Sequence, residues 1–339
     1  MADIVKEKPK KINFASDQDV RWCPGCGDYS ILAQIKKVLP DLGIDREKIV
    51  FVSGIGCASR FPYYLNTYGL HTIHGRAPSV ATGVKVANPD LTVFIITGDG
   101  DSLSIGGNHL MHICRRNVNV NIILFNNQIY GLTKGQYSPT SPEGKVTNTT
   151  PYGSIDTPFN PLAVVLGAGA SFVARTIDRD PKHMADIFRK AAAHKGTSFV
   201  EVYQNCNIFN DGAYRNLTDP KTKKDFLVYL EDEKPLIYGN EENQGVYLDG
   251  LKLSSAELSV RPENSPHVHT VQSGSDIYPY MLARMAEDAT LPTPVGVFHQ
   301  EERPIYEDQL HQQMDEVSKK KGKGNLKELF ISGNTWTVD

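Results

Sequence analysis

Two short apolar runs, separated by a helix-length segment, constrain the fold of this chain more than any other feature. Residues 91–96 and 120–125 are rich in Val, Ile and Phe and end in turn-forming residues, which is typical of strands buried on both faces of a parallel sheet. Residues 105–116 between them carry apolar side chains at helical spacing, including Cys114, which we expect to be a core residue. This order predicts a βαβ unit, and hence an α/β fold with a mostly parallel sheet and helices on both faces.

Polar residues close both predicted strands. Asp99 in the motif GDG follows the first strand and Asn127 in the motif NN follows the second, so the two become neighbours at the edge where open α/β folds bind ligands. Carboxylate and amide oxygens bind Mg²⁺, often together with phosphate oxygens, and Gly98 and Gly100 let phosphates approach the backbone. Taken separately, the motifs are ordinary turns. Their spacing resembles the diphosphate-binding signature of thiamine-diphosphate enzymes, which implies that Asp99, Asn127 and the carbonyl of Ile129 bind Mg²⁺.

Composition excludes several other classes of protein. The chain has 339 residues, enough for one large domain with an appendage. Its 36 basic and 39 acidic residues are nearly balanced, so nothing indicates a nucleic-acid partner. No apolar segment is long enough to span a bilayer, and the N-terminus lacks a hydrophobic signal core. We therefore expect a cytoplasmic protein without a membrane partner.

The chain divides by composition into three parts. Residues 1–18 are polar and rich in lysine and are expected to form an arm, whereas residues 19–210 carry the alternating strand and helix pattern. Residues 211–339 contain long polar and proline-containing stretches with short apolar runs. We expect this part to be an irregular extension that packs on a partner subunit. Residues 128–154 form a long Gly, Pro, Ser and Thr-rich loop, which is typical of a lid or of disorder.

A C-x-x-C motif lies just before a predicted helix. Cys23 and Cys26 belong to the sequence CPGC, and either Asp28 or Ser30 can cap the helix that follows. Five cysteines in the whole chain are too few and too scattered for a secreted disulfide scaffold. Reduced thiols that can act as metal ligands are therefore the better expectation.

Two further cysteines follow predicted strands. Cys57 comes after residues 49–52 and Cys206 after residues 198–203, so four thiolates can converge near one end of the sheet. Four sulfur ligands indicate zinc or an iron–sulfur cluster. A redox dithiol and unrelated buried thiols remain alternatives at this point.

The two candidate sites are informative in combination. Thiamine leaves an electron-rich species after a 2-oxoacid loses CO₂, and something must accept those electrons. Thiolate-ligated [4Fe–4S] clusters reach potentials down to about −700 mV, low enough for that purpose. A cluster beside a thiamine site would be an electron outlet, whereas zinc there would have no redox role.

Four sequence stretches together resemble the beta subunit of 2-oxoacid:ferredoxin oxidoreductases, and most closely the members that use 2-oxoglutarate. These stretches, within residues 20–215, are CPGCGDYSIL, SGIGCASRFPYY, HTIHGRA and NNQIYGLTKGQYSPT. The resemblance implies a thiamine-diphosphate-binding fold of the diphosphate-binding type, holding thiamine diphosphate, Mg²⁺ and one [4Fe–4S] cluster. It also implies an alpha subunit that supplies the pyrimidine-binding half and the activating glutamate, in a dimer of alpha–beta heterodimers with ferredoxin as electron acceptor.

The same resemblance implies roles for individual residues. It assigns the role of cluster ligands to Cys23, Cys26, Cys57 and Cys206. It assigns contacts with the cofactor to Ile55, Gly56, Cys57, Ala58, His74, Gly75, Gly98, Gly100, Asp101, Asn127, Gly131 and Leu132. Asp99, Asn127 and Ile129 hold Mg²⁺ in this scheme.

The implied reaction is coenzyme A-dependent oxidative decarboxylation of 2-oxoglutarate to succinyl-CoA and CO₂. The alternatives are the same chemistry on pyruvate or branched-chain 2-oxoacids, and a non-catalytic electron-transfer or zinc-binding subunit. A non-redox thiamine decarboxylase would leave the four cysteines unexplained. Arg60 lies three residues after Cys57, and its guanidinium suits the distal carboxylate of the substrate; a purely structural arginine is the alternative.

Overall fold

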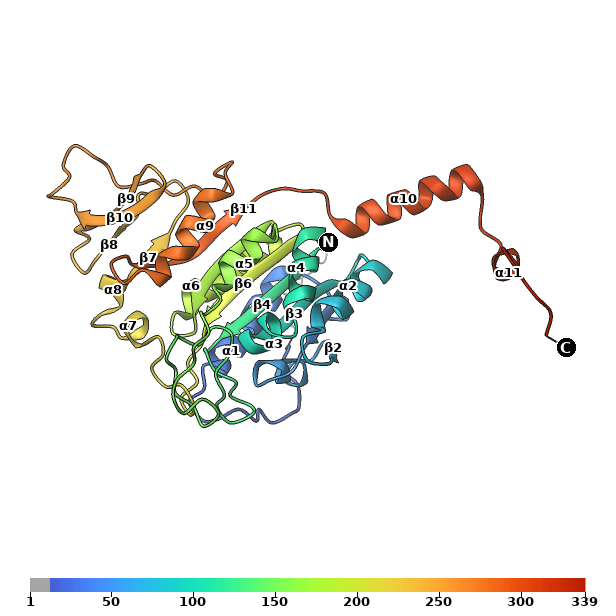
Figure 1. Cartoon of the computed structure of the whole chain (residues 1–339), viewed down its shortest axis with the longest axis horizontal. Helices are drawn as coiled ribbons and strands as arrows, with labels where there is room; N and C mark the ends of the chain where they lie inside the picture. Colours follow the sequence, from blue (N-terminus) through green and yellow to red (C-terminus); the bar gives the residue numbers. More distant parts are fainter. Residues whose placement is uncertain (1–12, 339) are drawn as a thin grey trace, which may run out of the picture.

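The apolar runs form the strands of one eight-stranded sheet (Figure 1). The computed structural model describes residues 13–338. In spatial order the strands are β2 (Tyr68–His71), β1 (Ile49–Ser53), β3 (Thr92–Gly98), β4 (Val120–Asn126), β6 (Thr197–Tyr203), β5 (Phe172–Ile177), β11 (Thr293–Gln300) and β7 (Leu227–Leu230). The first six are parallel, whereas β11 pairs antiparallel with β5 and parallel with β7.

Helices cover both faces of the sheet, as the sequence predicts. Side chains alternate along each strand, so that Val50 and Val52 belong to one core cluster and Ile49 and Phe51 to the other. The first cluster packs against α2 (Ala77–Ala87), α4 (Gly107–Arg116), α5 (Pro161–Gly167) and α9 (Ile277–Arg284). The second packs against α1 (Asp28–Val38) and α6 (Pro181–Ala193). Cys114 is fully buried in the first cluster, as predicted.

The central βαβ unit contains two helices where the sequence predicts one. The first, α3 (Asp99–Leu103), begins at the aspartate of GDG, and α4 follows after a break at Ser104. At this break, Gly75, which has φ +72°, lies against the backbone of Gly106. A Cβ on Gly75 would lie 2.5 Å from the Gly106 nitrogen. The break therefore lets the loop before α2 reach the end of β3.

The sheet continues past residue 210, where composition placed the end of the main domain. Both β7 and β11 come from the predicted extension. The boundary was misplaced because β11 contains Pro294 and Gly296, which read as irregular structure, although its Phe298 is fully buried. Three short strands, β8 (Ile237–Tyr238), β9 (Gln244–Asp249) and β10 (Lys252–Glu257), form a separate antiparallel sheet.

The two ends of the chain differ. Of the predicted arm, residues 1–12 lie outside the described residues, whereas Phe14 is buried in the core and its carbonyl accepts a hydrogen bond from Asn66. At the other end, α10 (Tyr306–Lys321) and α11 (Leu326–Phe330) extend away from the sheet (Figure 1). The packing of this end on a partner stays a prediction.

The remaining helices are short. They are η1 (Leu39–Leu42), η2 (Arg46–Lys48), η3 (Ala58–Tyr64), α7 (Arg215–Thr218), α8 (Lys223–Phe226) and η4 (Met285–Glu287). Within residues 13–338, no helix combines the length and the apolar character needed to cross a membrane.

Candidate active site at the carboxyl edge of the sheet

A cavity of about 120 Å³ lies where β1, β3 and β4 end. Because these strands are parallel, their carboxyl ends meet at one edge, and the residues that follow them surround the cavity. All but one of the predicted cofactor and Mg²⁺ residues line it; the exception is Gly75, whose backbone lies just behind. The lining includes Ile55, Gly56, Cys57, Ala58, His74, Gly98, Asp99, Gly100, Asp101, Asn127, Ile129, Gly131 and Leu132.

Asp99 presents a buried carboxylate to this cavity. It is only 2% exposed, and burial raises its pKa to about 6. The hydroxyls of Ser138 and Thr140 donate to Oδ2 at 2.5 and 2.6 Å, which partly opposes that shift. No cationic side chain among residues 13–338 forms an ion pair with Asp99. A buried carboxylate of this kind fits a bound cation.

Asn127 has an amide whose orientation is set by its neighbours. Its Nδ2 donates to Oε1 of Gln204 at 2.8 Å, while its Oδ1 accepts the backbone N–H of Ile129 at 3.2 Å. The side-chain oxygen therefore has acceptor capacity left. Together with Asp99 and a backbone carbonyl it would provide the hard oxygen ligands that Mg²⁺ requires, with diphosphate oxygens completing the set.

Asp101 uses its carboxylate to hold neighbouring segments of backbone in place. Its Oδ1 accepts the backbone N–H groups of Ile55 at 3.0 Å and Gly75 at 2.7 Å, and its Oδ2 accepts the hydroxyl of Thr97 at 2.7 Å. The side chain thus ties the loops that follow β1 and β2 to the end of β3. An anionic group engaged in this way is a poor contact for a diphosphate, which leaves only the backbone N–H of Asp101 for that contact.

The four predicted cluster cysteines line a second cavity. It measures about 230 Å³ and is bordered by Cys23, Cys26, Cys57 and Cys206. A Cβ on Gly131 would lie 3.7 Å from Sγ of Cys57 and 3.6 Å from Sγ of Cys206, so both sulfurs face the same glycine. None of the cysteines in the described residues forms a disulfide. The arrangement fits a group held by four thiolates.

The four thiols must lose their protons before they can bind a metal group. Among residues 13–338, no three His, Cys, Asp or Glu side chains lie in an arrangement that could hold a metal ion, and the iron–sulfur cluster stays a prediction. Burial raises the pKa of Cys57 to about 12 and raises that of Cys26 as well. Both thiols therefore need nearby positive charge, such as iron, to ionise.

The two cavities adjoin each other. They share Asp28, Cys57, Asn127, Gly131 and Leu132 as lining residues. A group in one would therefore be separated from a group in the other only by these few side chains. This adjacency is what the combination of a thiamine site and an electron acceptor requires.

Asp28 and Ser30 do not cap α1, contrary to the sequence expectation. The N-cap residue is Gly27, and no side chain bonds to the first turn. Asp28 instead turns inward, where it is 1% exposed and burial raises its pKa to about 7. The hydroxyl of Ser30 donates to the carbonyl of Asp178 at 2.6 Å. The tight CPGC loop brings α1 against the sheet edge, which leaves no room for a solvent-exposed cap.

Arg60 lies on the cysteine side of the edge. Its Nη1 donates to the carbonyl of Arg21 at 2.7 Å, and it lines the cysteine cavity but not the Asp99 cavity. This position favours the structural alternative for Arg60. Its role in reading a substrate carboxylate stays a hypothesis.

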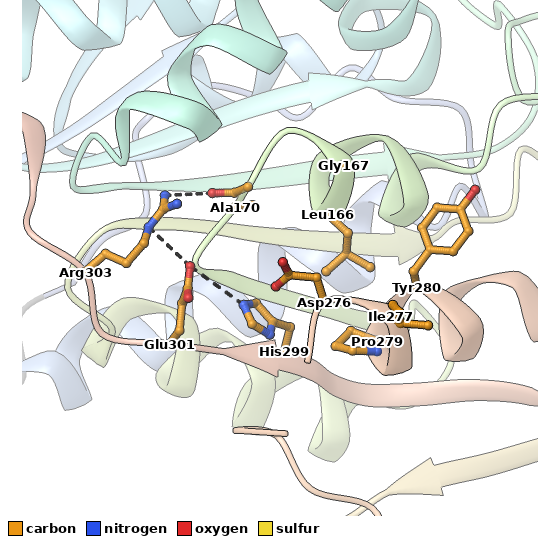
Figure 2. A pocket seen from close by; sticks show the side chains of 11 residues that line it. Leu166, Gly167, Ala170, Asp276, Ile277, Pro279, Tyr280, His299, Glu301 and Arg303 are labelled. Carbon is orange, nitrogen blue, oxygen red and sulfur yellow. Dashed lines mark hydrogen bonds and ion pairs between the residues drawn. The ribbon is translucent and has the colours of Figure 1, made fainter. Parts of the chain in front are cut away.

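Another cavity, of about 510 Å³, lies elsewhere (Figure 2). It lies beside the amino end of β5 and the carboxyl end of the antiparallel β11, and therefore at the opposite edge of the sheet. His299, Glu301 and Arg303 gather there around ion pairs, and none of the predicted site residues lines it.

Comparison with known proteins agrees with this geometry. Residues 54–202 match the family described as thiamine pyrophosphate enzyme, C-terminal TPP binding domain. The chain is 47% identical to the 2-oxoglutarate oxidoreductase subunit KorB of Mycobacterium tuberculosis, over 98% of this chain and 90% of that one. It is also 43% identical to the 2-oxoacid:ferredoxin oxidoreductase subunit beta of Saccharolobus solfataricus, over 63% of this chain and 69% of that one. This chain belongs to the beta subunits of the 2-oxoacid:ferredoxin oxidoreductases.

A solved relative extends the likeness to the whole beta subunit. The 2-oxoglutarate:ferredoxin oxidoreductase from Magnetococcus marinus, with 2-oxoglutarate, coenzyme A and succinyl-CoA bound, superposes with a TM-score of 0.76 at 32% identity. The match covers 98% of this chain and 98% of that one. The predicted family and fold class are thereby confirmed, and thiamine diphosphate is the cofactor of the matched domain.

Sequence reasoning missed four residues of the beta subunit's site. Ser138 and Thr140 bind Asp99, Gln204 binds Asn127, and the hydroxyl of Tyr130 donates to the carbonyl of Gly100 at 3.0 Å. The signal available for the first two was the SPTS sequence inside the long loop 128–154, which was expected to be either a lid or disordered. Nothing in the local pattern indicated that its hydroxyls turn back onto Asp99.

Proposed function

We propose that this chain is the beta subunit of a coenzyme A-dependent 2-oxoglutarate:ferredoxin oxidoreductase. It would hold the diphosphate half of thiamine diphosphate with Mg²⁺ and one [4Fe–4S] cluster. The observation that carries this proposal is the adjacency of two cavities, one lined by Asp99 and Asn127 and the other by four cysteines, with five residues in common. The names of the relatives support the choice of 2-oxoglutarate.

The residues around the first cavity would bind and orient the cofactor. Asp99, the side chain of Asn127 and the carbonyl of Ile129 would hold Mg²⁺, while Gly98 and Gly100 leave space for the diphosphate. When bound, thiamine diphosphate supplies the electron sink that decarboxylation of a 2-oxoacid needs, and an iron–sulfur cluster supplies a one-electron acceptor.

The chain's other groups would shape and close the site. Asp101 fixes two loops against the end of β3 through its hydrogen bonds to Ile55, Gly75 and Thr97. Gly131 and Leu132 lie between the cavities and would keep water from the reacting centre. Cys23, Cys26, Cys57 and Cys206 would ligate the cluster beyond them.

The site would be completed by a partner chain. A beta subunit implies an alpha subunit, which we propose supplies the pyrimidine half and the activating glutamate, in a dimer of alpha–beta heterodimers. Ferredoxin would carry the electrons away, and the cytoplasm is the expected location. This subunit alone is expected to be inactive.

The test is anaerobic purification of this subunit with its copurifying partner. We expect bound thiamine diphosphate, iron and sulfide in the ratio of one [4Fe–4S] cluster to each of these chains, and coenzyme A-dependent reduction of ferredoxin by 2-oxoglutarate. Faster turnover of pyruvate or branched-chain 2-oxoacids would overturn the substrate assignment. Zinc in place of iron, or a complex without thiamine diphosphate, would overturn the function itself.

A further inference from the structure

A row of buried polar side chains leads from the middle of the sheet to Asp99. Arg175 of β5 donates through Nε to Oε2 of Glu201 on β6 at 2.6 Å, and Nδ2 of Asn126 on β4 donates to Oε1 of Glu201 at 2.7 Å. Oγ1 of Thr140 lies 2.9 Å from Oδ1 of Asn126 and 2.6 Å from Oδ2 of Asp99. Four separate segments are thus joined to the predicted Mg²⁺ ligand.

All five side chains in this row are shielded from water. Glu201 is fully buried, and the others are at most 4% exposed. Burying polar and charged groups is costly unless each finds partners, and within the described residues none of the five has an orphaned side-chain atom. A buried ion pair such as Arg175–Glu201 does not by itself stabilise a protein much. The hydrogen-bonded connection to Asp99 therefore suggests a second role for Glu201.

The donors and acceptors fix the direction of the row. The Glu201 carboxylate only accepts hydrogen bonds, so the amide of Asn126 must turn Nδ2 toward it and Oδ1 toward Thr140. Thr140 has one hydroxyl hydrogen, which it shares as a three-centre hydrogen bond between Oδ2 of Asp99 at 2.6 Å and Oδ1 of Asn126 at 2.9 Å. The hydroxyl of Ser138 also donates to Oδ2 of Asp99, and no side chain among residues 13–338 donates to Oδ1. Oδ1 of Asp99 is therefore the oxygen that no side chain occupies, while the backbone N–H groups of Gly100 and Asp99 also favour the ionised carboxylate.

We propose that Glu201 is a positioning residue for Mg²⁺. Through Asn126 and Thr140 it holds the Asp99 carboxylate with Oδ2 occupied and Oδ1 presented to the metal. This inference rests on the proposed thiamine diphosphate and Mg²⁺ site, and adds to it a residue of β6 that has no contact with the cavity. Loss of a group that orients a metal ligand typically weakens metal affinity about 10- to 100-fold.

The test measures Mg²⁺ binding in the copurified complex after removal of its cofactor. Retention of thiamine diphosphate is followed in equilibrium dialysis as Mg²⁺ is titrated, for the wild type, Glu201→Gln and Thr140→Val. Both variants keep the shape of the side chain. We expect the Mg²⁺ midpoint to rise by about tenfold or more in each, with full retention of thiamine diphosphate at saturating Mg²⁺.

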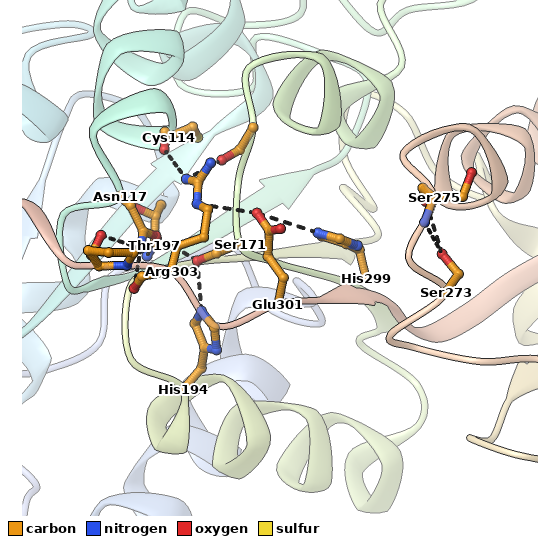
Figure 3. Close-up of polar contacts among 12 residues, drawn as sticks. Cys114, Asn117, Ser171, His194, Thr197, Ser273, Ser275, His299, Glu301 and Arg303 are labelled. Carbon is orange, nitrogen blue, oxygen red and sulfur yellow. Dashed lines mark hydrogen bonds and ion pairs between the residues drawn. The ribbon is translucent and has the colours of Figure 1, made fainter.

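A matched control separates positioning from general loss of packing. Ser171 is a fully buried hydroxyl at the opposite edge of the sheet, where it donates to Oδ1 of Asn117 at 2.6 Å and contacts His194 (Figure 3). Ser171→Ala removes a buried hydrogen bond without touching the row. Its Mg²⁺ midpoint should equal that of the wild type even if its melting temperature falls.

The double variant Glu201→Gln with Thr140→Val decides whether Glu201 acts through Thr140. If it does, the two effects on the Mg²⁺ midpoint are not additive, and the double variant resembles the single ones. Additive effects in the double variant would overturn the inference. A wild-type Mg²⁺ midpoint in Thr140→Val would also overturn it, and this measurement can be made even if Glu201→Gln does not fold. A wild-type complex that retains no thiamine diphosphate with Mg²⁺ would instead overturn the proposed function.

Discussion

Among the glycines that line the cofactor cavity, Gly100 has the least room for a side chain. A Cβ at this position would lie 2.2 Å from Cε1 of Tyr130, whose hydroxyl donates to the carbonyl of Gly100. We expect Gly100→Ala to displace the Tyr130 ring at a cost of about 1–3 kcal/mol, and to weaken binding of thiamine diphosphate measured by dialysis.

Gly107 offers the matched control for this prediction. It lies in the first turn of α4 with open space around its Cα, so Gly107→Ala should leave cofactor affinity unchanged and slightly raise the melting temperature. Equal affinity in the Gly100→Ala and Gly107→Ala complexes would show that Tyr130 does not shape the cofactor site.

His194 should make the protein sensitive to acid. Burial, followed by the nearby His299 and Arg303, lowers its pKa from 6.5 to about 4. Because its folded pKa lies below the unfolded one, the unfolded chain binds more protons between these values, so stability falls as the pH falls from 6.5 to 4. At about 1.4 kcal/mol per pKa unit, the upper limit of this loss is roughly 3.5 kcal/mol, and solvent screening of the partly exposed ring makes the actual loss smaller.

The variant His194→Gln isolates this contribution, because glutamine can keep a hydrogen bond to Ser171. Urea unfolding at several pH values should give a smaller loss of stability below pH 6.5 for the variant than for the wild type. Parallel pH profiles would mean that His194 does not cause the sensitivity.

At the same scale, the sequence predicts those site residues that directly follow a strand. Asp99, Cys57 and Asn127 could be placed because parallel strands end at a common edge. Ser138 and Thr140 could not, since their positions depend on how a long loop folds back onto that edge. Gln204 directly follows β6 and could have been placed in the same way, but it was missed. The hydrogen bonds of the Asp101 carboxylate could not be predicted for a related reason: its backbone donors, Ile55 and Gly75, come from distant loops. Its contact with the diphosphate stays a prediction.

Among the structural elements, the ends of α1, β1 and β6 together determine where the cysteines meet. Cys206→Ser should remove the ligand that follows β6, and we expect the purified complex to lose most of its iron and its ferredoxin reduction. The smaller, harder oxygen of serine is a poor replacement for a thiolate on iron.

Cys114 gives the control for the cysteine set. It is buried in α4 within an apolar cluster, and burial raises its pKa to about 12. Cys114→Ser should therefore keep the full iron content, with at most a loss of melting temperature. Loss of iron in this variant, or full iron content in Cys206→Ser, would contradict the proposed ligand set.

Secondary structure was predictable where the hydrophobic pattern is regular. The helix α6 and the strands β3, β4 and β6 fall within one or two residues of their expected positions. The pattern failed at the α3–α4 break, which a tertiary contact between Gly75 and Gly106 requires. It also failed at β11, where a proline and a glycine with φ +136° hid a buried strand.

On the scale of the whole molecule, the cofactor cavity opens beside apolar side chains that this chain leaves exposed. Ile73 precedes His74 and is 74% exposed, and Ile105 and Leu132 on neighbouring loops are 54% and 42% exposed. We expect this face to bind the alpha subunit, because that chain must complete the thiamine diphosphate site.

Ile73→Asp should then weaken the association of the two subunits. Burial of one isoleucine side chain contributes about 1.5–3 kcal/mol, so affinity should fall roughly tenfold or more in sedimentation or pull-down measurements. Met111, 44% exposed on α4 and outside the C-terminal part expected to contact a partner, provides the control Met111→Asp. If both variants bind the alpha subunit as the wild type does, the interface lies elsewhere.

The most direct test of the account is whether substrate electrons reach the four-cysteine group. The oxidised complex is mixed anaerobically with 2-oxoglutarate and coenzyme A in the absence of ferredoxin, and the cluster is followed by EPR with and without bound thiamine diphosphate. The account predicts a signal of the reduced [4Fe–4S] cluster only when thiamine diphosphate is bound. Release of CO₂ with the cluster still oxidised would contradict it, because the two adjoining cavities would then not exchange electrons.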